Sequence, residues 1–365
     1  MNPPGDGGRQ RAGTRVVIRR PGGYRRLELE DGSSAEPSAG EARVRVAAAG
    51  VNYADCVVRM GLYAAAKRDV GFPITPGFEF AGIVSAVGAD VSDLEVGDRV
   101  FGVTRFGAYA TDVVVPRAQV FRLPTRRTEI EGAAFPVAFL TAWYALRELA
   151  PPRPGANVLV HSAAGGVGSA LVQLGALAGA RMIGVVGRPE KVEVARRSGA
   201  AVVIDKTREP LWSRARDEAP RGFDVILDAN GAETLGESYR HLAPAGRLVV
   251  YGFHGMLPRG RGRPSWLRLA IQYFRTPRFN PLEMTSTNRS VLAFNLAFLF
   301  DRHDLLARAM AELLPLFAEG SIGAPRIRTF ALERVADAHR ELEGGATVGK
   351  LVLTTGGATA VLPDA

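Results

Sequence analysis

Hydrophobic and polar residues alternate along the first third of the chain, in short segments that glycine and proline separate. Such alternation predicts strands with one buried face. The predicted strands are Thr14–Arg20, Tyr24–Glu30, Glu41–Ala49, Phe80–Val87, Arg99–Val103, Ala108–Pro116 and Val120–Leu123. Many short strands with this punctuation predict a compact, barrel-like β module.

The pattern changes after residue 128. Residues Glu129–Leu149 have helical spacing, which Pro136 interrupts. From Asn157 to Phe253, continuously apolar strands then alternate with helical segments, as expected for a parallel sheet that is buried on both faces. These strands are Val158–Ser162, Arg181–Val186, Ala201–Ile204, Asp224–Asp228 and Arg247–Tyr251. The pattern therefore predicts an α/β chain whose second domain is a doubly wound sheet.

The last part of the chain is mixed in pattern. Ser290–Phe300 and Leu305–Glu319 have helical spacing, and the strands Arg326–Ala331 and Lys350–Thr354 flank the predicted helix Glu333–Glu343. These two strands fall outside the parallel pattern and could return to the first module.

Length and composition agree with a two-domain globular protein. The chain has 365 residues, of which 47% are hydrophobic and 23% charged, and no apolar run reaches the length of a transmembrane helix. Residues 1–14 are rich in glycine, proline and arginine, so we expect a disordered leader rather than a secretory signal. Cys56 is the single cysteine, which excludes a disulfide framework and fits a cytoplasmic protein.

The net charge of +9 raises the question of nucleic-acid binding. The basic residues are scattered, and no recognition helix, zinc finger or aromatic ribonucleoprotein motif accompanies them, so no nucleic-acid partner is expected. One stretch, Pro258–Phe279, interleaves arginines with aromatic residues. It could lie on an anionic membrane surface, but a helical lid over the substrate cleft is the favoured interpretation.

A glycine turn follows the first strand of the predicted parallel sheet. It reads Ala163-Ala164-Gly165-Gly166-Val167-Gly168 and precedes the helical segment Ser169–Leu177. Strand, glycine turn and helix together predict a pyrophosphate site, because backbone N–H groups and the helix N-terminus can approach the anion. The motif alone leaves an ordinary tight turn equally open. The sheet around it favours cofactor binding by Ala164, Gly165, Gly166, Val167 and Gly168.

The second parallel strand, Arg181–Val186, ends without the carboxylate that would bind the ribose hydroxyls of NAD. Gly187 leaves room there, and Arg188 and Lys191 supply positive charge for a 2′-phosphate. Lys206 follows the third strand and could add to the same pocket. The alternative to phosphate binding is that Arg188 and Lys191 are merely solvated residues at the start of a helix, with Glu190 as a nearby opposing charge. The sequence favours NADPH.

Several motifs in order resemble the zinc-free quinone oxidoreductase group of the medium-chain dehydrogenase/reductase superfamily. The motifs are Gly50-Val51-Asn52-Tyr53-Ala54-Asp55, Gly61-Leu62-Tyr63, Pro76-Gly77-Phe78-Glu79-Phe80-Ala81-Gly82, Val96-Gly97-Asp98-Arg99-Val100, Leu140-Thr141-Ala142, the glycine turn and Val348-Gly349-Lys350-Leu351-Val352. The basic segment after Tyr251-Gly252 resembles the branch of the vesicle amine transport protein homologues. The resemblance implies a GroES-like catalytic domain (15–139), a Rossmann domain (140–285) and a return to the first domain (286–365).

The chain departs from the zinc alcohol dehydrogenases of this superfamily at one informative place. They carry Gly-His-Glu where this chain has Gly77-Phe78-Glu79, and phenylalanine cannot ligate a metal. Cys56 and the distant histidines form no recognisable zinc spacing, so no metal is expected. Without a Lewis acid, reduction of an electrophilic π-system is favoured over oxidation of an alcohol.

The resemblance also implies site residues. Asn52, Tyr53 and Asp55 would form the catalytic end beside the nicotinamide, with Tyr53 and Tyr63 as substrate walls. The remaining cofactor positions are Thr141, Asn230, Gly252, Phe253, Phe294, Asn295 and Lys350. Helix capping by Asn52 and Asp55, and plain packing of Phe294 and the tyrosines, are the alternatives.

The predicted function is hydride transfer from NADPH to a quinone or an α,β-unsaturated carbonyl. An enoyl reductase of a biosynthetic pathway is the rival within the same chemistry. A nucleotide-binding protein that docks to membranes or partners is the rival from another class. The resemblance further implies a homodimer, formed through an edge strand of the Rossmann sheet near Asn280–Thr287.

Overall fold

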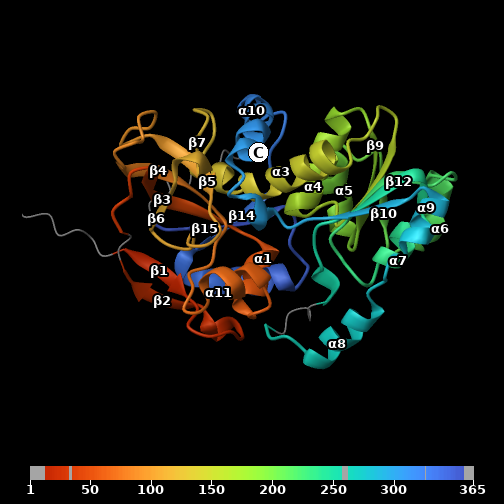
Figure 1. The fold of residues 1–365 in the computed structure, drawn as a ribbon, viewed down its shortest axis with the longest axis horizontal. Helices are drawn as coiled ribbons and strands as arrows, with labels where there is room; N and C mark the ends of the chain where they lie inside the picture. Colours follow the sequence, from red (N-terminus) through yellow and green to blue (C-terminus); the bar gives the residue numbers. More distant parts are fainter. Residues whose placement is uncertain (1–12, 33–34, 257–261, 325, 357–365) are drawn as a thin grey trace, which may run out of the picture.

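The computed structural model describes residues 13–32, 35–256, 262–324 and 326–356. Of the expected leader, residues 1–12 lie outside the described residues, and Thr14 begins strand β1 (Thr14–Val17). The described chain holds two large sheets at opposite sides of Figure 1, with helices α3 (Pro136–Trp143), α4 (Gly166–Leu177) and α10 (His303–Glu319) between them.

The first large sheet has seven strands. They are β3 (Glu41–Val51), β4 (Glu79–Val87), β5 (Arg99–Val103), β6 (Asp112–Pro116), β7 (Val120–Arg122), β14 (Ile327–Ala331) and β15 (Lys350–Thr354). The order is β14-β15-β3-β4-β5-β7, with β6 paired to β3. Strand β15 runs antiparallel to β3, with Leu351 opposite Val51, so the C-terminal strands join the sheet of the N-terminal part.

The second sheet has six strands, all parallel. They are β8 (Asn157–His161), β9 (Arg181–Val186), β10 (Val202–Asp205), β11 (Phe223–Asp228), β12 (Leu242–Val250) and β13 (Ser290–Ala293). The order is β10-β9-β8-β11-β12-β13, which is the doubly wound Rossmann order. The predicted α/β fold is therefore confirmed.

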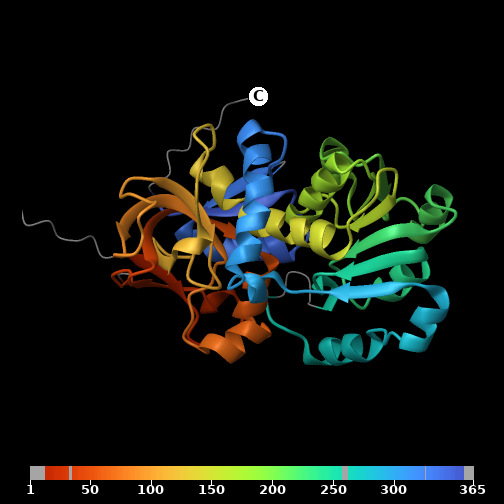
Figure 2. The ribbon, with the colours of Figure 1, turned by 45° about the horizontal axis from the view of Figure 1, so that its top comes forward.

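Helices connect these strands and cover the sheets. The remaining elements are β2 (Glu28–Asp31), α1 (Tyr53–Arg59), α2 (Glu129–Ala133), α5 (Val192–Arg197), α6 (Leu211–Glu218), α7 (Leu235–Arg240), α8 (Trp266–Arg275), α9 (Pro281–Thr287) and α11 (Val335–Glu343). Figure 2 shows α10 crossing the middle of the molecule between the two sheets. Among the described residues, every helix is too short or too polar to span a bilayer.

The predicted helix Glu129–Leu149 is broken near its first third. Thr128 and Glu131 form a capping box that starts α2, and Pro136 occupies the first turn of α3. Proline has no N–H to continue the preceding helix, but its fixed φ suits a helix start. After the break, α3 packs against α4 and α10.

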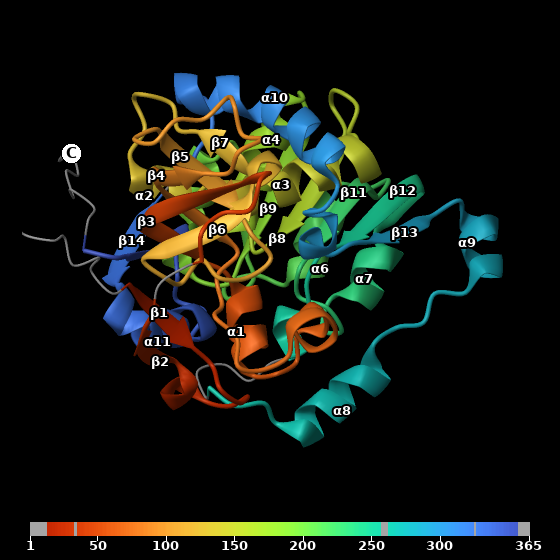
Figure 3. The same cartoon turned by 60° about the vertical axis from the view of Figure 1, so that its left-hand side comes forward.

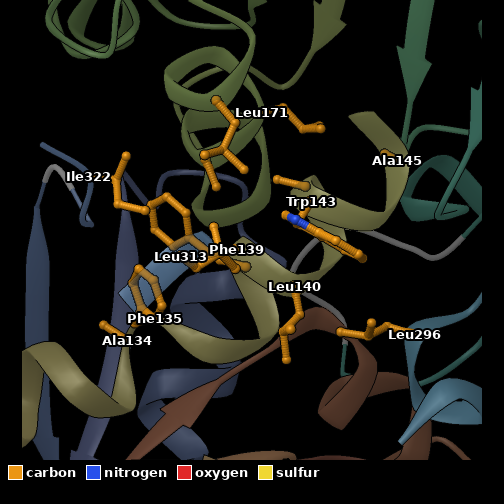
Figure 4. Close-up of a cluster of buried hydrophobic side chains, with 14 of the residues drawn as sticks. Ala134, Phe135, Phe139, Leu140, Trp143, Ala145, Leu171, Leu296, Leu313 and Ile322 are labelled. Atoms are coloured by element: carbon orange, nitrogen blue, oxygen red, sulfur yellow. The ribbon is translucent and has the colours of Figure 1, made fainter. Parts of the chain in front are cut away.

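The core between the two domains is aromatic. Figure 4 shows Phe135 and Phe139 from the α3 segment beside Leu171 of α4 and Leu313 of α10. The rings of Phe135 and Phe139 stack with centroids 4.4 Å apart, and Phe317 stacks on Phe135 at 4.0 Å. Interlocked rings of this kind resist sliding. They pack the start of α3 against α10 in the core between the two sheets.

Three sequence predictions of local structure are wrong. Ser290–Phe300 starts with strand β13 and continues as a short 3-10 turn, Leu296–Leu299, instead of a helix. Residues Tyr24–Arg26 form a 3-10 turn where a strand was expected. The edge strand of the Rossmann sheet is β13, whereas Asn280–Thr287 holds the N-cap and body of helix α9.

Candidate cofactor cleft

The glycine turn joins β8 to α4. Gly165 is the N-cap of α4 with extended backbone angles, and its N–H donates to the Ser162 carbonyl at 3.0 Å. The first N–H groups of a helix have no partner within the helix. The N–H groups of Gly166, Val167 and Gly168 are therefore available to an anion, and all three residues line a cleft of about 400 Å³.

Gly168 has no room for a side chain. A Cβ at this position would lie 2.1 Å from the Ser162 carbonyl oxygen and 2.9 Å from Ala163 Cα. The turn itself is tight, since Ser162 has a positive φ of 58°. The missing Cβ lets α4 pack directly on the end of β8, which is the helix–strand contact that a dinucleotide turn requires.

The cleft lies at the carboxyl ends of the parallel strands, between the two sheets, and gathers most of the predicted site. The predicted residues on its lining are Asn52, Tyr53, Tyr63, Thr141, Ala164, Gly165, Gly166, Val167, Gly168, Gly187, Arg188, Lys191, Lys206, Asn230, Phe294, Asn295 and Lys350. Asp55, Gly252 and Phe253 are absent from that lining. Gly252 and Phe253 follow β12 and pack instead beside Ala229 and Gly231.

One end of the cleft is basic. Arg188, Lys191 and Lys206 line it around Gly187, where a Cβ would come within 3.3 Å of the Lys206 side chain. Glu190, the rival charge, is absent from the lining and lies 3.8 Å from Arg188 in an exposed ion pair. The end of β9 therefore presents positively charged side chains to the cleft, and Gly187 leaves space between them.

The opposite wall of the cleft comes from the segment before β15, which the sequence reasoning missed apart from Lys350. Gly349 donates its N–H to the Ala164 carbonyl at 2.9 Å and forms a bridge with Gly165. Lys191 Nζ donates to the Gly345 carbonyl at 2.9 Å. The available sequence signal was the glycine itself directly before the strand, and in the structure Gly349 adopts a positive φ of 71°, which glycine accommodates without strain.

A buried ion pair lies at the other end of the cleft. Lys350 Nζ is 2.6 Å from Glu79 Oε1 and donates to Asn52 Oδ1 at 2.6 Å. Asn52 Nδ2 in turn donates to Glu79 Oε1 at 2.8 Å, and Glu79 Oε2 accepts the Val137 N–H at 2.8 Å. Glu79 is fully buried, so these contacts replace its water. A glutamate at the start of an apolar strand was the sequence signal for a special role of Glu79, but not for its partner.

Asp55 supports the cleft from behind. Its carboxylate accepts the N–H groups of Asn52 (2.8 Å) and Gly77 (2.9 Å) and the hydroxyl of Tyr109 (3.0 Å). Burial raises the pKa of Asp55 to about 7, although these donors and the nearby Lys350 charge oppose the rise. Asp55 and Asn52 form the capping box of α1, so Asp55 holds Asn52 in place.

Aromatic side chains line the end of the cleft that holds the Lys350–Glu79 pair. Tyr63 donates to Asn295 Oδ1 at 2.9 Å and packs edge-on against Phe78, and burial raises its pKa to about 12. Tyr53 donates to the His254 carbonyl at 3.2 Å, and its ring lies 4.2 Å from the His254 imidazole. His254 lines the cleft as well, a position that its sequence context did not indicate.

One buried group of residues has the chemistry of a metal site. The possible ligand atoms of Cys56, His339 and Glu343 lie within 4.8 Å of one another, a proximity that the sequence spacing did not show. Arg59 occupies this group, because its guanidinium is 2.6 Å from Glu343 and 3.3 Å from His339 Nδ1. An arginine cannot lose its charge, so these residues do not fit a second cation.

Comparison with known proteins agrees with this architecture. Residues 38–125 match the family described as the alcohol dehydrogenase GroES-like domain, and residues 198–353 match the family described as zinc-binding dehydrogenase. The chain is 35% identical over 338 residues to the synaptic vesicle membrane protein VAT-1 homolog of Rattus norvegicus, covering 92% of this chain and 82% of that protein. The chain belongs to the medium-chain dehydrogenase/reductase superfamily.

Two solved structures of this oxidoreductase superfamily are similar throughout. The Escherichia coli quinone oxidoreductase complexed with NADPH has a TM-score of 0.81 and 28% identity, covering 94% of this chain and 100% of that chain. The CurK enoyl reductase has a TM-score of 0.80 and 27% identity, covering 94% and 99%. The resemblance to zinc-free quinone oxidoreductases and to VAT-1 homologues that the motifs predicted is thus confirmed.

Proposed function

We propose that this protein is a zinc-independent, NADPH-dependent reductase of quinones or α,β-unsaturated carbonyls. The observation that carries the proposal is the cleft between the two sheets. Its basic end holds Arg188, Lys191 and Lys206, and its catalytic end holds the Lys350–Glu79–Asn52 cluster. The E. coli relative that contains NADPH has the same fold over its full length, which supports the choice of cofactor.

The residues of the cleft fit NADPH along its length. The N–H groups at the start of α4 suit the pyrophosphate, and the three cations around Gly187 suit a 2′-phosphate. When bound, NADPH supplies the hydride that reduces the substrate. Thr141, Phe294 and Asn295 line the space between these groups and the catalytic end, so they would orient the nicotinamide.

The catalytic end can polarise a substrate oxygen without a metal. The Lys350 ammonium contacts Glu79, and the Asn52 amide is hydrogen-bonded to both side chains. Preorganised donors of this kind stabilise the negative charge that develops on the oxygen during reduction. Tyr53, which lines the cleft and whose hydroxyl donates to the His254 carbonyl at 3.2 Å, would supply the proton. Phe78 fills the place where a ligating histidine would be needed.

The test compares kcat/KM with NADPH and with NADH across ortho- and para-quinones, simple enones and thioester enoyl chains. We expect the parent to prefer NADPH to NADH. Lys206→Ala should reduce this preference by about tenfold, which is the scale of one charge-assisted hydrogen bond. Lys67→Ala, an exposed lysine away from the cleft, is the control. Equal use of NADH would overturn the cofactor assignment.

Tyr53→Phe with unchanged turnover would remove Tyr53 as the proton source, and Tyr273→Phe is its control.

A second candidate function is an enoyl reductase of a biosynthetic pathway. The observation in its favour is the likeness to the CurK enoyl reductase over nearly the whole of both chains. The same panel separates the two functions, because turnover confined to thioester enoyl chains would select this alternative.

We also propose a homodimer formed through strand β13. This strand ends the sheet order, so one of its sides has no strand partner among the described residues. A second copy could pair with it antiparallel and continue the sheet. Sedimentation velocity of the full chain tests the dimer, and a monomer at micromolar concentration contradicts it.

A further inference from the structure

Arg59 is a fully buried arginine that lies outside the cleft lining. It is the last residue of α1, and its guanidinium is 2.6 Å from Oε1 of Glu343, which is buried as well. Taking two opposite charges out of water costs free energy that their attraction often does not return, and apolar residues of similar volume often serve a fold equally well. The fixed geometry of this pair therefore needs a reason besides stability.

The guanidinium joins segments that are far apart in sequence. It donates to the carbonyls of Gly22 at 3.2 Å and Gly262 at 3.1 Å. It also lies 3.3 Å from His339 Nδ1 in α11, the helix that Glu343 ends. A lysine ammonium has three N–H donors and could not serve these four acceptors at once, whereas the guanidinium has five in a fixed plane. Arg59 therefore holds α1, α11 and the segment at Gly262 in one arrangement.

Helix α11 lies beside α1, as Figures 1 and 3 both show. Gly262 belongs to the segment that leads from β12 to α8. Of residues 262–287, all of them described, none lines the cleft, so the lid that the sequence favoured for Pro258–Phe279 is not observed in its described part. This segment instead contacts the GroES-like domain at Arg59 and at Tyr24, whose ring lies 2.6 Å from where a Gly262 Cβ would be.

Glu343 ends α11 and begins one wall of the cleft. Residues 343–345 and Gly349 line the cleft. The Gly345 carbonyl accepts Lys191 Nζ at 2.9 Å, and Gly349 donates its N–H to the glycine turn at 2.9 Å. Glycine restricts the backbone less than any other residue, so this wall depends on its two ends for its position. Its first end is the Glu343 carboxylate, which Arg59 holds together with the hydroxyl of Tyr24 at 2.7 Å.

Arg59 also supports the N-terminus of α1. Asp55, one turn before Arg59, accepts the backbone N–H of the N-cap Asn52. A second connection runs through His339, whose pKa is held well below its ordinary value by burial and by the Arg59 charge, so that the ring is neutral. Arginine only donates, so Nδ1 accepts and Nε2 carries the ring proton. Nε2 faces the Tyr109 hydroxyl at 3.5 Å, and that hydroxyl donates to Asp55 at 3.0 Å.

We propose that Arg59 is a positioning residue for both ends of the cleft. It holds the wall of residues 343–349, which carries the acceptor of Lys191, in place relative to the N-terminus of α1, which carries Asn52. This inference rests on the proposed function, in which NADPH binds at the basic end and the substrate is reduced at the other. Cofactor binding and turnover then both depend on a side chain that lines neither end.

The test removes the ion pair without leaving a buried charge behind. Arg59→Met/Glu343→Gln has no unpaired carboxylate, so the variant should remain folded by circular dichroism. We expect the Kd of NADPH, measured by calorimetry, to rise about tenfold, the scale of one charge-assisted hydrogen bond. At saturating NADPH, kcat should fall about 10–100-fold, as expected for a misplacement of about 1 Å. A folded double variant with the Kd and kcat of the parent would show that the pair only stabilises the fold, and would overturn the proposal.

Two controls assign the effect to Arg59. Arg340→Met removes a second arginine of α11 that packs over the same Tyr24 ring but is exposed, and it should keep the Kd and kcat of the parent. Glu343→Gln alone retains Arg59 and a hydrogen-bond acceptor for it, so both constants should change far less than in the double variant. If Glu343→Gln alone gave the full effect, the cleft would depend on Glu343 directly, and the role of Arg59 would be wrong.

A double-mutant cycle tests the connection to the basic end. Lys191→Ala should raise the Kd of NADPH about tenfold in the parent. In the Arg59→Met/Glu343→Gln background it should raise Kd only about threefold, because the Gly345 carbonyl that orients Lys191 is no longer held in place. The same factor in both backgrounds would contradict the connection.

Amide hydrogen exchange of the ligand-free protein separates this inference from the proposed function. In Arg59→Met/Glu343→Gln, residues 343–350 and 52–56 should exchange about tenfold faster than in the parent, while β9 should be unchanged. Unchanged exchange in residues 343–350 overturns the positioning role, whether or not the parent binds NADPH. A parent that does not bind NADPH overturns the proposed function instead, and the exchange result still decides the role of Arg59.

Discussion

Lys350 is held by two buried polar side chains, Glu79 and Asn52. Its ammonium contacts Glu79 and Asn52 at 2.6 Å each, in a place where Glu79 is fully buried and Lys350 is 4% exposed. The three side chains come from β15, the strand β4 and the N-cap of α1. This end of the cleft, which we propose to be catalytic, is therefore assembled only when three separate parts of the chain have met.

Removing the Lys350 charge should destabilise the fold as well as the site. Lys350→Met leaves Glu79 buried without its partner, so we expect a loss of about 3–5 kcal/mol in the free energy of unfolding. Urea unfolding followed by circular dichroism measures it, with the exposed Lys67→Met as control. The double variant Glu79→Gln/Lys350→Met should lose less than the sum of the single losses. Additive losses would show that the two groups do not interact.

Asp55 should make stability depend on pH. Its folded-state pKa of about 7 lies above the ordinary value of 3.8, so the native state binds the proton more tightly than the unfolded chain does. This contribution is present below about pH 4 and is lost as the pH rises through 7. We expect the stability of the parent, relative to Asp55→Asn, to fall between these values. Urea unfolding across the range tests it against the exposed Asp217→Asn, and a constant difference would contradict it.

At the scale of elements, the glycine turn depends on a close approach that only glycine permits. Gly168→Ala would place a Cβ 2.1 Å from the Ser162 carbonyl, so α4 must shift away from β8. We expect a loss of about 1–3 kcal/mol in stability and a smaller rise in melting temperature on adding NADPH. Thermal unfolding with and without NADPH measures both.

The matched control lies in α7, another helix that packs against the parallel sheet. Gly236 in α7 has open space where a Cβ would be, so Gly236→Ala should be neutral or raise stability by up to about 1 kcal/mol. Its response to NADPH should equal that of the parent. If Gly168→Ala and Gly236→Ala had the same stability and the same response to NADPH, the close contact between Gly168 and Ser162 would not be needed for cofactor binding.

The sequence predicted the strands of the parallel sheet well because a strand buried on both faces is a continuous apolar run bounded by glycine. Strand β9, for example, has the predicted bounds Arg181–Val186. The same property caused the error at β13, where the run Ser290–Phe300 is apolar except for Ser290 and Asn295 and its period does not distinguish strand from helix.

The gathering of the proposed cofactor residues at one cleft was predictable for a related reason. The glycine turn, Gly187 and Lys206 all follow parallel strands directly, and the carboxyl ends of such strands meet at one edge. The pairing of Lys350 with Glu79 could not be predicted, because it depends on how strands distant in sequence come together in the other sheet. The role of Asp55 behind the cleft depends on side-chain direction, which residue spacing does not give.

At the scale of the whole molecule, the cleft has walls from both sheets. Gly165 and Gly349 form a bridge across it, and Lys191 contacts the Gly345 carbonyl. A ligand in this cleft should therefore order both walls. We expect NADPH to slow amide hydrogen exchange in residues 163–168 and, equally, in residues 343–350. Protection confined to 163–168 would place the cofactor on the Rossmann side alone, and the α8 segment serves as the internal control.

Strand β15 has a consequence for the order in which the chain folds. It pairs with β3, so the sheet that the ribosome produces first receives one of its inner strands last. Until then, β3 offers an open edge to any extended chain nearby. The Rossmann strands β8 to β13 follow one another in sequence, so their sheet needs no strand from a later part of the chain. During synthesis, the domain in the middle of the chain can be native while the one that precedes it is still incomplete.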